Sequence, residues 1–247
     1  MDKFLYVAMS GARESMRAQA VNSHNLANAS TVGFRAELAA SGAQPSGEGP
    51  MAAARTHSAL SVSAWSRAAG PTRSTGRDLD IAVDGDGWIA VQAPDGGEAY
   101  TRAGDLRLDA AGGLRNGAGH AVLGDGGPIV VPPHASLVLG TDGSISIVPL
   151  GQGAETTATV GRIKLVKPEP AQLERGTDGL FRTRDGAAAP GDPSVRVLSG
   201  ALEGSNVNVA DTMVRMIELS RQFEMHMKTL RTAEDNARSS ASLMRLG

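Results

Sequence analysis

The chain has 247 residues, and its 24 lysine and arginine residues nearly balance its 26 aspartate and glutamate residues, which argues against a broad charged surface for nucleic acid or anionic membranes. It has no cysteine, which excludes disulfides, thiolate metal ligands and a cysteine nucleophile. Glycine is abundant, at 31 residues, whereas aromatic residues make up only 3%, so we expect partners to supply part of the buried surface.

The N-terminal residues 2–26 are predicted to form a helix. Apolar or small residues recur at steps of four and three, and no proline interrupts them. Asp2 can cap the start. Gly33 is interpreted as a C-cap glycine at the end, and Phe34 as a local hydrophobic staple. The stripe consists of Leu5, Met9, Ala12, Met16, Ser23 and Leu26, with Gln19 as an additional polar member.

The same N-terminal segment does not predict a cleavable secretory signal. Its apolar run, residues 4–9, is short and stops at Ser10 and Gly11. No stretch of the sequence is long and apolar enough to predict a transmembrane helix. We therefore expect a protein that is either cytoplasmic or exported without cleavage.

Residues 35–76 are predicted to be a connector. Their composition turns to alanine, serine, glycine, proline and threonine, with Trp65 as the only large anchor. A short strand is expected at residues 60–65.

Residues 77–200 are predicted to form an antiparallel β domain. Short apolar or alternating runs are separated by turn pairs, in which Asn, Asp and Gly tolerate the positive φ of tight hairpins. These pairs are Asp95-Gly96, Gly112-Gly113, Asn116-Gly117, Asp142-Gly143 and Asp178-Gly179.

Residues 208–246 are predicted to form a long C-terminal helix, because they contain neither glycine nor proline. Asn208, with Asp211 three residues later, is a capping-box-like start. At about 1.5 Å per residue the helix would reach roughly 55 Å, which is too long for the β domain to cover. The two terminal helices must therefore pack on each other, on copies of the chain or on another protein. The stripe of this helix is Val209, Met213, Met216, Ser220, Phe223, Met227, Leu230, Glu234, Ala237, Ala241 and Met244.

No motif in the sequence predicts a catalytic residue, a cofactor site or a metal site. Residues 84–87, Asp-Gly-Asp-Gly, begin like a calcium loop, but the later ligand positions are out of register, so a hairpin turn is the favoured interpretation. The histidines share no metal-binding spacing, and the common hydrolase and nucleotide-binding patterns are absent.

Three motifs together resemble one protein family. Residues 20–35 read AVNSHNLANASTVGFR, which is similar to the N-terminal pattern NNLANxxTxGF of bacterial flagellar rod and hook proteins, with His24 where the family usually has Asn. Residues 200–210, GALEGSNVNVA, resemble the second motif of that family, and residues 100–106, YTRAGDL, its β domain. The matching motif residues are Asn25, Leu26, Ala27, Asn28, Thr31, Gly33 and Phe34.

Asn22, Asn25 and Asn28 recur every three residues within the first motif. On pattern alone they could be solvated amides at a fraying helix end. The resemblance favours a second interpretation, in which they form hydrogen bonds across a subunit junction.

The resemblance implies an α+β fold in which the N- and C-terminal helices form a coiled-coil-like inner layer, with a central antiparallel β domain outside it. We therefore expect an N-terminal helix and motif at 1–34, a connector at 35–76, the β domain at 77–200 and the C-terminal helix at 201–247. The apolar members of the two stripes are assigned to subunit contacts. They are Leu5, Met9, Ala12, Met16, Leu26, Val209, Met213, Met216, Phe223, Met227, Leu230, Ala237, Ala241 and Met244.

The resemblance also implies a function, which is that of a structural subunit of the flagellar proximal rod and not of an enzyme. Its partners would be copies of itself, other rod proteins and the flagellar type III export apparatus. The implied location is the basal body, in a rod that crosses the periplasm and helps to transmit motor torque.

Two alternatives stay open at this point. The chain could be another axial member of the family, from the distal rod or the hook. Less favoured is a secreted, β-rich binding module or enzyme whose terminal helices merely dimerise, because such a protein needs a concave site with convergent polar groups, and no motif supplies one.

Overall fold

The computed structural model describes residues 2–45, 56–151 and 156–245 and divides the chain into two compact units. The first, here called the helical unit, comprises Met1–Ala29, Ala36–Ser66 and Val207–Gly247. The second, the β unit, comprises Ser30–Arg35 and Arg67–Asn206. Each unit therefore combines segments that are far apart in the sequence.

Two long helices dominate the helical unit. Helix α1 is Asp2–Ala27 and helix α2 is Val209–Arg245, so the helices predicted at 2–26 and 208–246 are confirmed to within one residue at each end. The wider bound of 201–247 for the C-terminal helix is corrected, because Ala201–Glu203 forms a strand and the chain belongs to the β unit up to Asn206. The predicted cap of α2 is also confirmed, since the Asn208 Oδ1 accepts hydrogen bonds from the Ala210 amide at 3.0 Å and the Asp211 amide at 3.4 Å.

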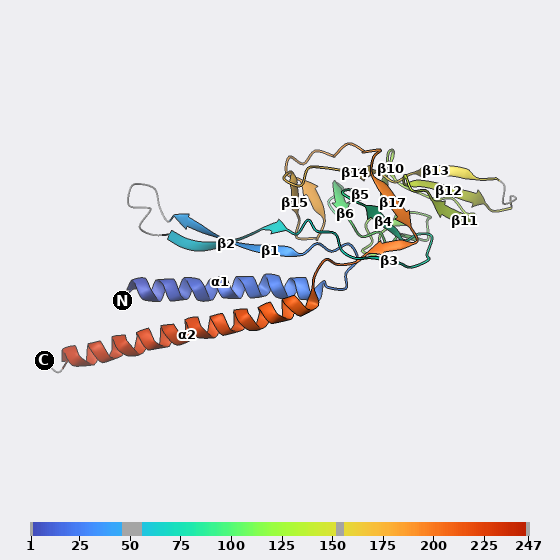
Figure 1. Ribbon diagram of the computed structural model, residues 1–247. Helices are drawn as coiled ribbons and strands as arrows, with labels where there is room; N and C mark the ends of the chain where they lie inside the picture. Colours follow the sequence, from blue (N-terminus) through green and yellow to red (C-terminus); the bar gives the residue numbers. More distant parts are fainter. Residues whose placement is uncertain (1, 46–55, 152–155, 246–247) are drawn as a thin grey trace. The chain divides into compact units, whose positions relative to one another are not determined.

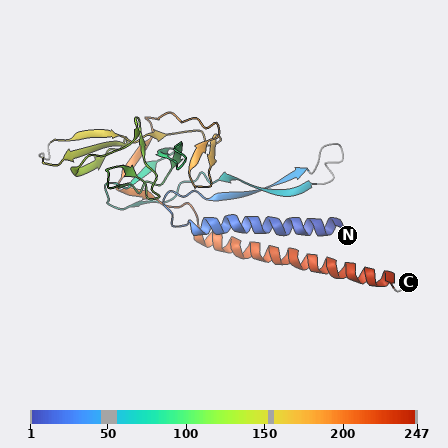
Figure 2. The same cartoon turned by 180° about the vertical axis from the view of Figure 1, so that it is seen from behind.

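The two helices lie side by side and antiparallel (Figures 1 and 2). Early in α1, Gly11 lies against His226, whereas late in α1 the Asn22 Nδ2 donates to the Thr212 carbonyl at 2.7 Å. With this pairing α2, which is 37 residues long against 26 for α1, continues past the first turn of α1 (Figure 1).

A two-stranded hairpin completes the helical unit. Strand β1, Glu37–Pro45, pairs antiparallel with β2, Thr56–Trp65, and α1 contacts both strands. The strand expected at residues 60–65 is confirmed as part of β2, whereas the interpretation of residues 35–76 as a connector is corrected, since β1 and β2 pair within it. Backbone pairing forms this hairpin, so its small side chains gave little apolar pattern to read.

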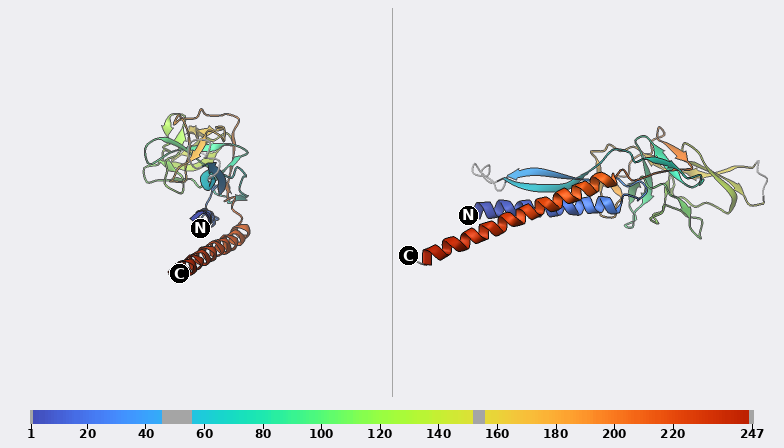
Figure 3. Two further views of the ribbon diagram at one scale, coloured as in Figure 1. Left: turned by 90° about the vertical axis from the view of Figure 1, so that its left-hand side faces the viewer. Right: turned by 60° about the horizontal axis from the view of Figure 1, so that its bottom comes forward.

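Short strands joined by turns and loops make up the described part of the β unit (Figure 3). Every pairing among these strands is antiparallel. Its largest sheet has the strand order β14-β5-β6-β16-β15, and a second sheet has the order β11-β12-β13. The remaining strands form the pairs β17-β4, β18-β3, β7-β8 and β10-β9. The bounds are β3 Thr72–Ser74, β4 Ile81–Asp84, β5 Trp88–Gln92, β6 Glu98–Thr101, β7 Arg107–Leu108, β8 Leu114–Arg115, β9 Leu123–Gly124, β10 Gly127–Pro128, β11 His134–Leu139, β12 Ser144–Pro149, β13 Ala158–Arg162, β14 Leu165–Val166, β15 Leu173–Arg175, β16 Phe181–Thr183, β17 Arg196–Ser199 and β18 Ala201–Glu203.

Predicted turn pairs join the two strands of several hairpins. Gly96 has φ 84° between β5 and β6, and Gly143 has φ 83° between β11 and β12, so these two hairpin predictions are confirmed. The turn at residues 84–87 differs from its prediction. It connects β4 to β5, which pair in different sheets, and it is therefore a bend between sheets and not a hairpin.

An aliphatic core fills the β unit. Its largest fully buried side chains include Ile81, Ile89, Leu106, Leu114 and Ile145. The scarcity of aromatic residues therefore does not deprive this unit of a core, because β-branched and leucine side chains fill it.

Neither helix in the described ranges is apolar enough over sufficient length to cross a membrane.

Buried Tyr100, on β6, predicts how the stability of the β unit depends on pH. Its Oη accepts the Ala189 amide at 2.7 Å and lies 3.0 Å from the Glu98 Oε1, and burial raises the pKa of Tyr100 to about 12. The unfolded chain releases this proton at about pH 10. Unfolding free energy should therefore fall as the pH rises from about 10 to about 12.

Urea unfolding across this range measures the effect, with Tyr100→Phe as the control. The variant should lose the tyrosine-dependent part of the slope. It should also be about 1–3 kcal/mol less stable at neutral pH, because the Ala189 amide loses its acceptor. An unchanged slope in the variant would contradict the assignment.

Candidate subunit interface

Small side chains are prominent among the buried positions of α1 and α2, which pack against each other. The buried positions of α1 include Ala8, Ala12 and Ser15, and those of α2 are Thr212 and Ala233. Spacings of three and four residues keep such positions on one helix face. Since the side chains are small, the helix backbones can approach closely.

At Gly11 the backbone of α1 lies directly against a side chain of α2. A Cβ atom built on this residue would lie 2.5 Å from the Cε1 atom of His226, so the imidazole occupies the space of the missing side chain. Glycine inside a helix costs about 1 kcal/mol relative to alanine. The packing of His226 against the bare backbone explains why glycine stands here.

The predicted interface stripes coincide only in part with this contact. In α1, Ala12 is buried and Leu26 half-buried, whereas Met9 and Met16 are exposed. The side chain of Leu5 lies outside the described residues.

In α2 the division is similar. Val209 and Met213 are exposed. The side chains of Ala241 and Met244 are not among those described. The half-buried members of the predicted stripe are Met216, Phe223, Met227, Leu230 and Ala237.

Besides Leu219, sequence reasoning missed several small or polar residues on this side of the helices, which are Ala8, Ser15, Asn22, Thr212, His226 and Ala233. Within each helix these residues recur at steps of seven, next to the predicted stripes. A search for large apolar residues gave these positions too little weight.

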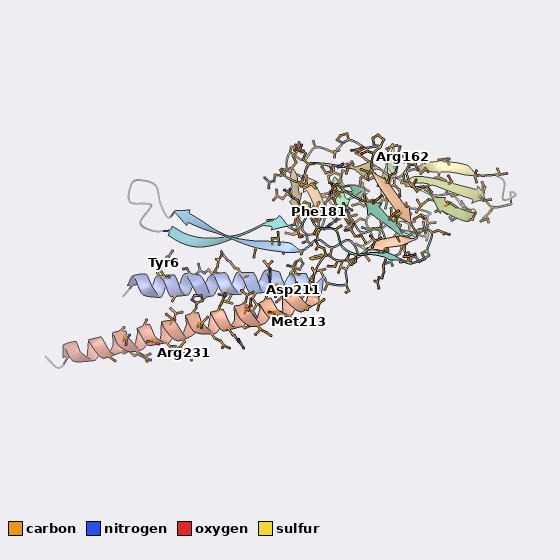
Figure 4. The ribbon with its side chains drawn as sticks, viewed as in Figure 1. Tyr6, Arg162, Phe181, Asp211, Met213 and Arg231 are labelled. Carbon is orange, nitrogen blue, oxygen red and sulfur yellow. The ribbon has the colours of Figure 1, made fainter. Side chains whose placement is uncertain are left out.

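Five of the exposed apolar residues of the two helices form what we call the apolar flank, defined as Met9, Met16, Val209, Met213 and Ile217. Their exposed fractions are 49%, 58%, 42%, 52% and 56%. Tyr6, Val7, Val214 and Met225 are also exposed and lie outside the flank. Figure 4 shows Met213 in the first turns of α2, with Arg231 farther along the same helix.

The apolar flank lies on one side of the helix pair. Met9 and Met16 each follow a buried contact residue of α1 by one position, and Met213 follows the buried Thr212 of α2 in the same way. One position turns an α-helix by about 100°. In an antiparallel pair, equal rotations away from the contact bring both sets of side chains to the same side.

The asparagines of the first motif form hydrogen bonds inside the helical unit. The Asn25 Oδ1 accepts from the Glu37 amide at 2.8 Å, and its Nδ2 donates to the Glu37 carbonyl at 2.9 Å. Asn22 bonds the Thr212 carbonyl of α2, as described above. The interpretation as solvated amides is therefore wrong for Asn22 and Asn25, whereas bonds across a subunit junction stay a prediction. The two amides fasten α1 to β1 and to α2.

The second half of the motif belongs to the β unit. Helix α1 already ends at Ala27, so Gly33, with φ 67°, is not its C-cap. The Gly33 amide donates instead to the Glu203 carbonyl at 2.8 Å. Phe34 is buried beneath the guanidinium of Arg175, 4.6 Å from the ring centroid, and is not a local staple. Both predictions failed because the partners of these residues are distant in the sequence.

Three buried charges lie beside this segment. The Glu203 carboxylate contacts the Arg35 Nη2 at 2.8 Å and the Arg102 Nη1 at 3.0 Å, and all three side chains are at most 4% exposed. Burial lowers the pKa of both guanidinium groups, and the Glu203 carboxylate opposes that shift. Sequence reasoning quoted all three residues within motifs but did not pair them.

Comparison with known proteins agrees with these elements. Residues 5–35 match the family described as "Flagella basal body rod protein", residues 82–147 match "Flagellar hook protein FlgE/F/G D1 domain", and residues 198–243 match "Flagellar basal body rod FlgEFG protein C-terminal". The chain is 45% identical to the flagellar basal-body rod protein FlgF of Escherichia coli K12, over 96% of both chains. The chain belongs to the FlgF-type flagellar basal-body rod proteins.

Other relatives agree with this membership. The FlgF protein of Salmonella typhimurium LT2 is 43% identical over 96% of both chains. The FlgG protein of Bacillus subtilis 168 is 32% identical over 99% of this chain and 100% of its own length. The family predicted from the three motifs is thus confirmed, and it is a structural rod family of the flagellar basal body and not an enzyme family.

The packing at Gly11 predicts a specific loss of stability. In Gly11→Leu the new side chain collides with the His226 ring and separates α1 from α2, so we expect a loss of about 1–3 kcal/mol in the unfolding of the helices. Urea unfolding followed by helical circular dichroism measures this loss.

Two further variants control the Gly11 experiment. Arg17→Leu places the same side chain at an exposed position of α1 and should have little effect. The double variant Gly11→Leu/His226→Ala removes the ring and should recover part of the loss. If Gly11→Leu were as stable as Arg17→Leu, the close contact would be disproved.

Proposed function

We propose that this FlgF-type protein is a structural subunit of the flagellar proximal rod, which assembles helically through its terminal helices. The observation that carries the proposal is the apolar flank, five large apolar side chains left in water on one side of the helix pair. Such a surface in a soluble protein marks a protein interaction site.

The chemistry of the flank favours open assembly. In the proposed assembly the flank contacts a different surface of the next subunit. A contact between unlike surfaces produces a helical filament unless the rotation closes a ring. Three of the five residues are methionines, whose flexible thioethers adapt to imperfectly equivalent neighbours.

The remaining parts of the proposal come from family membership. We propose that α1 and α2 contribute to a coiled-coil-like inner layer of the rod. The proposed partners are copies of this chain and other rod proteins. The rod crosses the periplasm and transmits motor torque. The chain reaches it through the flagellar export apparatus without cleavage of a signal peptide.

Charges introduced on the apolar flank test the assembly. Met213→Asp/Ile217→Asp should leave the monomer folded, because both side chains are exposed, but should prevent rod formation by placing unpaired charges in an apolar contact. The measurement is complementation of a strain that lacks its own copy, scored by motility and by electron microscopy of basal bodies.

The matched control is Val130→Asp/Val138→Asp. These valines of the β unit are 60% and 62% exposed, so the control adds the same charges at similar exposure outside the helices. It should assemble like the wild type. Normal rods in the flank variant would contradict the proposed contact.

A further inference from the structure

The chain passes between the two units four times. It leaves or enters the β unit between residues 29 and 30, 35 and 36, 66 and 67, and 206 and 207. The covalent connections between the two units in the chain are these four crossings. Residues of the β unit that bond these crossing segments are therefore candidates to carry force between the two units.

One carboxylate lies at the centre of those residues. The Glu203 Oε1 contacts the Arg35 Nη2 at 2.8 Å and accepts the Gly70 amide at 3.0 Å, and its Oε2 accepts the Arg102 Nη1 at 3.0 Å. Arg102 is tied in turn to the turn after β4, since its Nη2 donates to the Gly85 carbonyl at 2.7 Å. Glu203 thus joins three distant segments of the β unit.

The segment at each crossing bonds either Glu203 itself or a segment that contacts Glu203. At the first, the Gly33 amide donates to the Glu203 carbonyl. Arg35 is the last residue before the second crossing. Its guanidinium also donates to the Arg67 carbonyl at 3.2 Å and to the Ala68 carbonyl, just after the third.

The fourth crossing follows Asn206. The Asn206 amide donates to the Phe34 carbonyl at 3.2 Å, and its Nδ2 donates to the Ala68 carbonyl at 2.7 Å. The fourth crossing is therefore bonded to the segments of the first three.

Aromatic rings enclose the cluster and exclude water from it. The Arg102 guanidinium lies 5.4 Å from the Trp88 ring, which packs 4.5 Å from Phe181. Arg175 covers Phe34 on the other side and donates to the Arg35 carbonyl at 3.2 Å. Figure 4 labels Phe181 within this unit. In such a dry setting an ion pair is strong, and the loss of one partner leaves uncompensated charge.

We propose that Glu203 is the central residue of a clamp that fastens all four crossings to the β unit, so that force from the helical unit enters the β unit at this cluster. The transmission of force rests on the proposed rod function. The clamp itself does not. Without the Glu203 charge, two buried guanidinium groups face each other unpaired and the four segments separate.

Hydrogen exchange of the full-length protein tests the clamp. In Glu203→Gln, amides at the crossings, namely Gly33, Gly70 and Asn206, should exchange about tenfold faster or more, while core amides such as Ile89 and Ile145 keep their rates. An ordinary stabilising ion pair predicts the opposite pattern, with uniform loss of protection across the β unit.

The control is Glu98→Gln, which removes a carboxylate paired with Lys164 at 2.8 Å elsewhere in the β unit. It should leave the crossings unchanged. If Glu203→Gln does not fold, Arg35→Met is used instead, because the Glu203 carboxylate then still pairs with Arg102 and no buried charge of the cluster is left without a partner. We expect faster exchange at Gly33 and Asn206 in that variant. The clamp would be overturned if the folded variant kept the wild-type exchange rates at the crossings, or if it lost protection uniformly across the β unit.

Swimming tests the mechanical role separately. In a strain without its own copy, Glu203→Gln should build rods but lose swimming speed more steeply than the wild type or Glu98→Gln as the medium becomes more viscous. If the wild type, Glu98→Gln and Glu203→Gln lost swimming speed equally with rising viscosity, force would not be transmitted through the clamp. If the wild-type chain itself built no rods, the proposed function would fail while the exchange result still decided the clamp.

Discussion

The burial of Glu203 between Arg35 and Arg102 is the constraint on which the β unit depends. A buried carboxylate is tolerated only where donors compensate for its lost hydration, and here two guanidinium groups and the Gly70 amide do so. Arg35 comes from the N-terminal motif and Glu203 from the C-terminal one. The β unit is therefore complete only when both ends of the chain contribute.

The helical unit follows a different rule, in which small residues are inside and several large ones outside. Gly11, Ala12 and Thr212 allow α1 and α2 to approach closely. Met216 and Met227 are half-buried, whereas Met9, Met16 and Met213 remain on the surface. In an isolated helix pair such an apolar surface stays exposed to water, whereas in the proposed rod a neighbouring subunit covers it.

The unusual composition has a similar local explanation. Aliphatic residues fill the β core, so few aromatic residues are needed there. Of the few that exist, Phe34, Trp88 and Phe181 gather around the guanidinium groups of Arg102 and Arg175. Their flat faces accept guanidinium groups where a leucine would only exclude water.

The sequence by itself determined the two helices, the cap at Asn208, several hairpin turns and the family, because each is encoded by neighbouring residues or by a contiguous motif. Tertiary structure alone decided which track of α1 faces α2, that residues 37–65 contain a hairpin, and that Gly33 and Phe34 serve the β unit. The pairing of Arg35 with Glu203 belongs to the same group. Periodicity reports which residues share a face, whereas partners distant in the chain meet only through the fold.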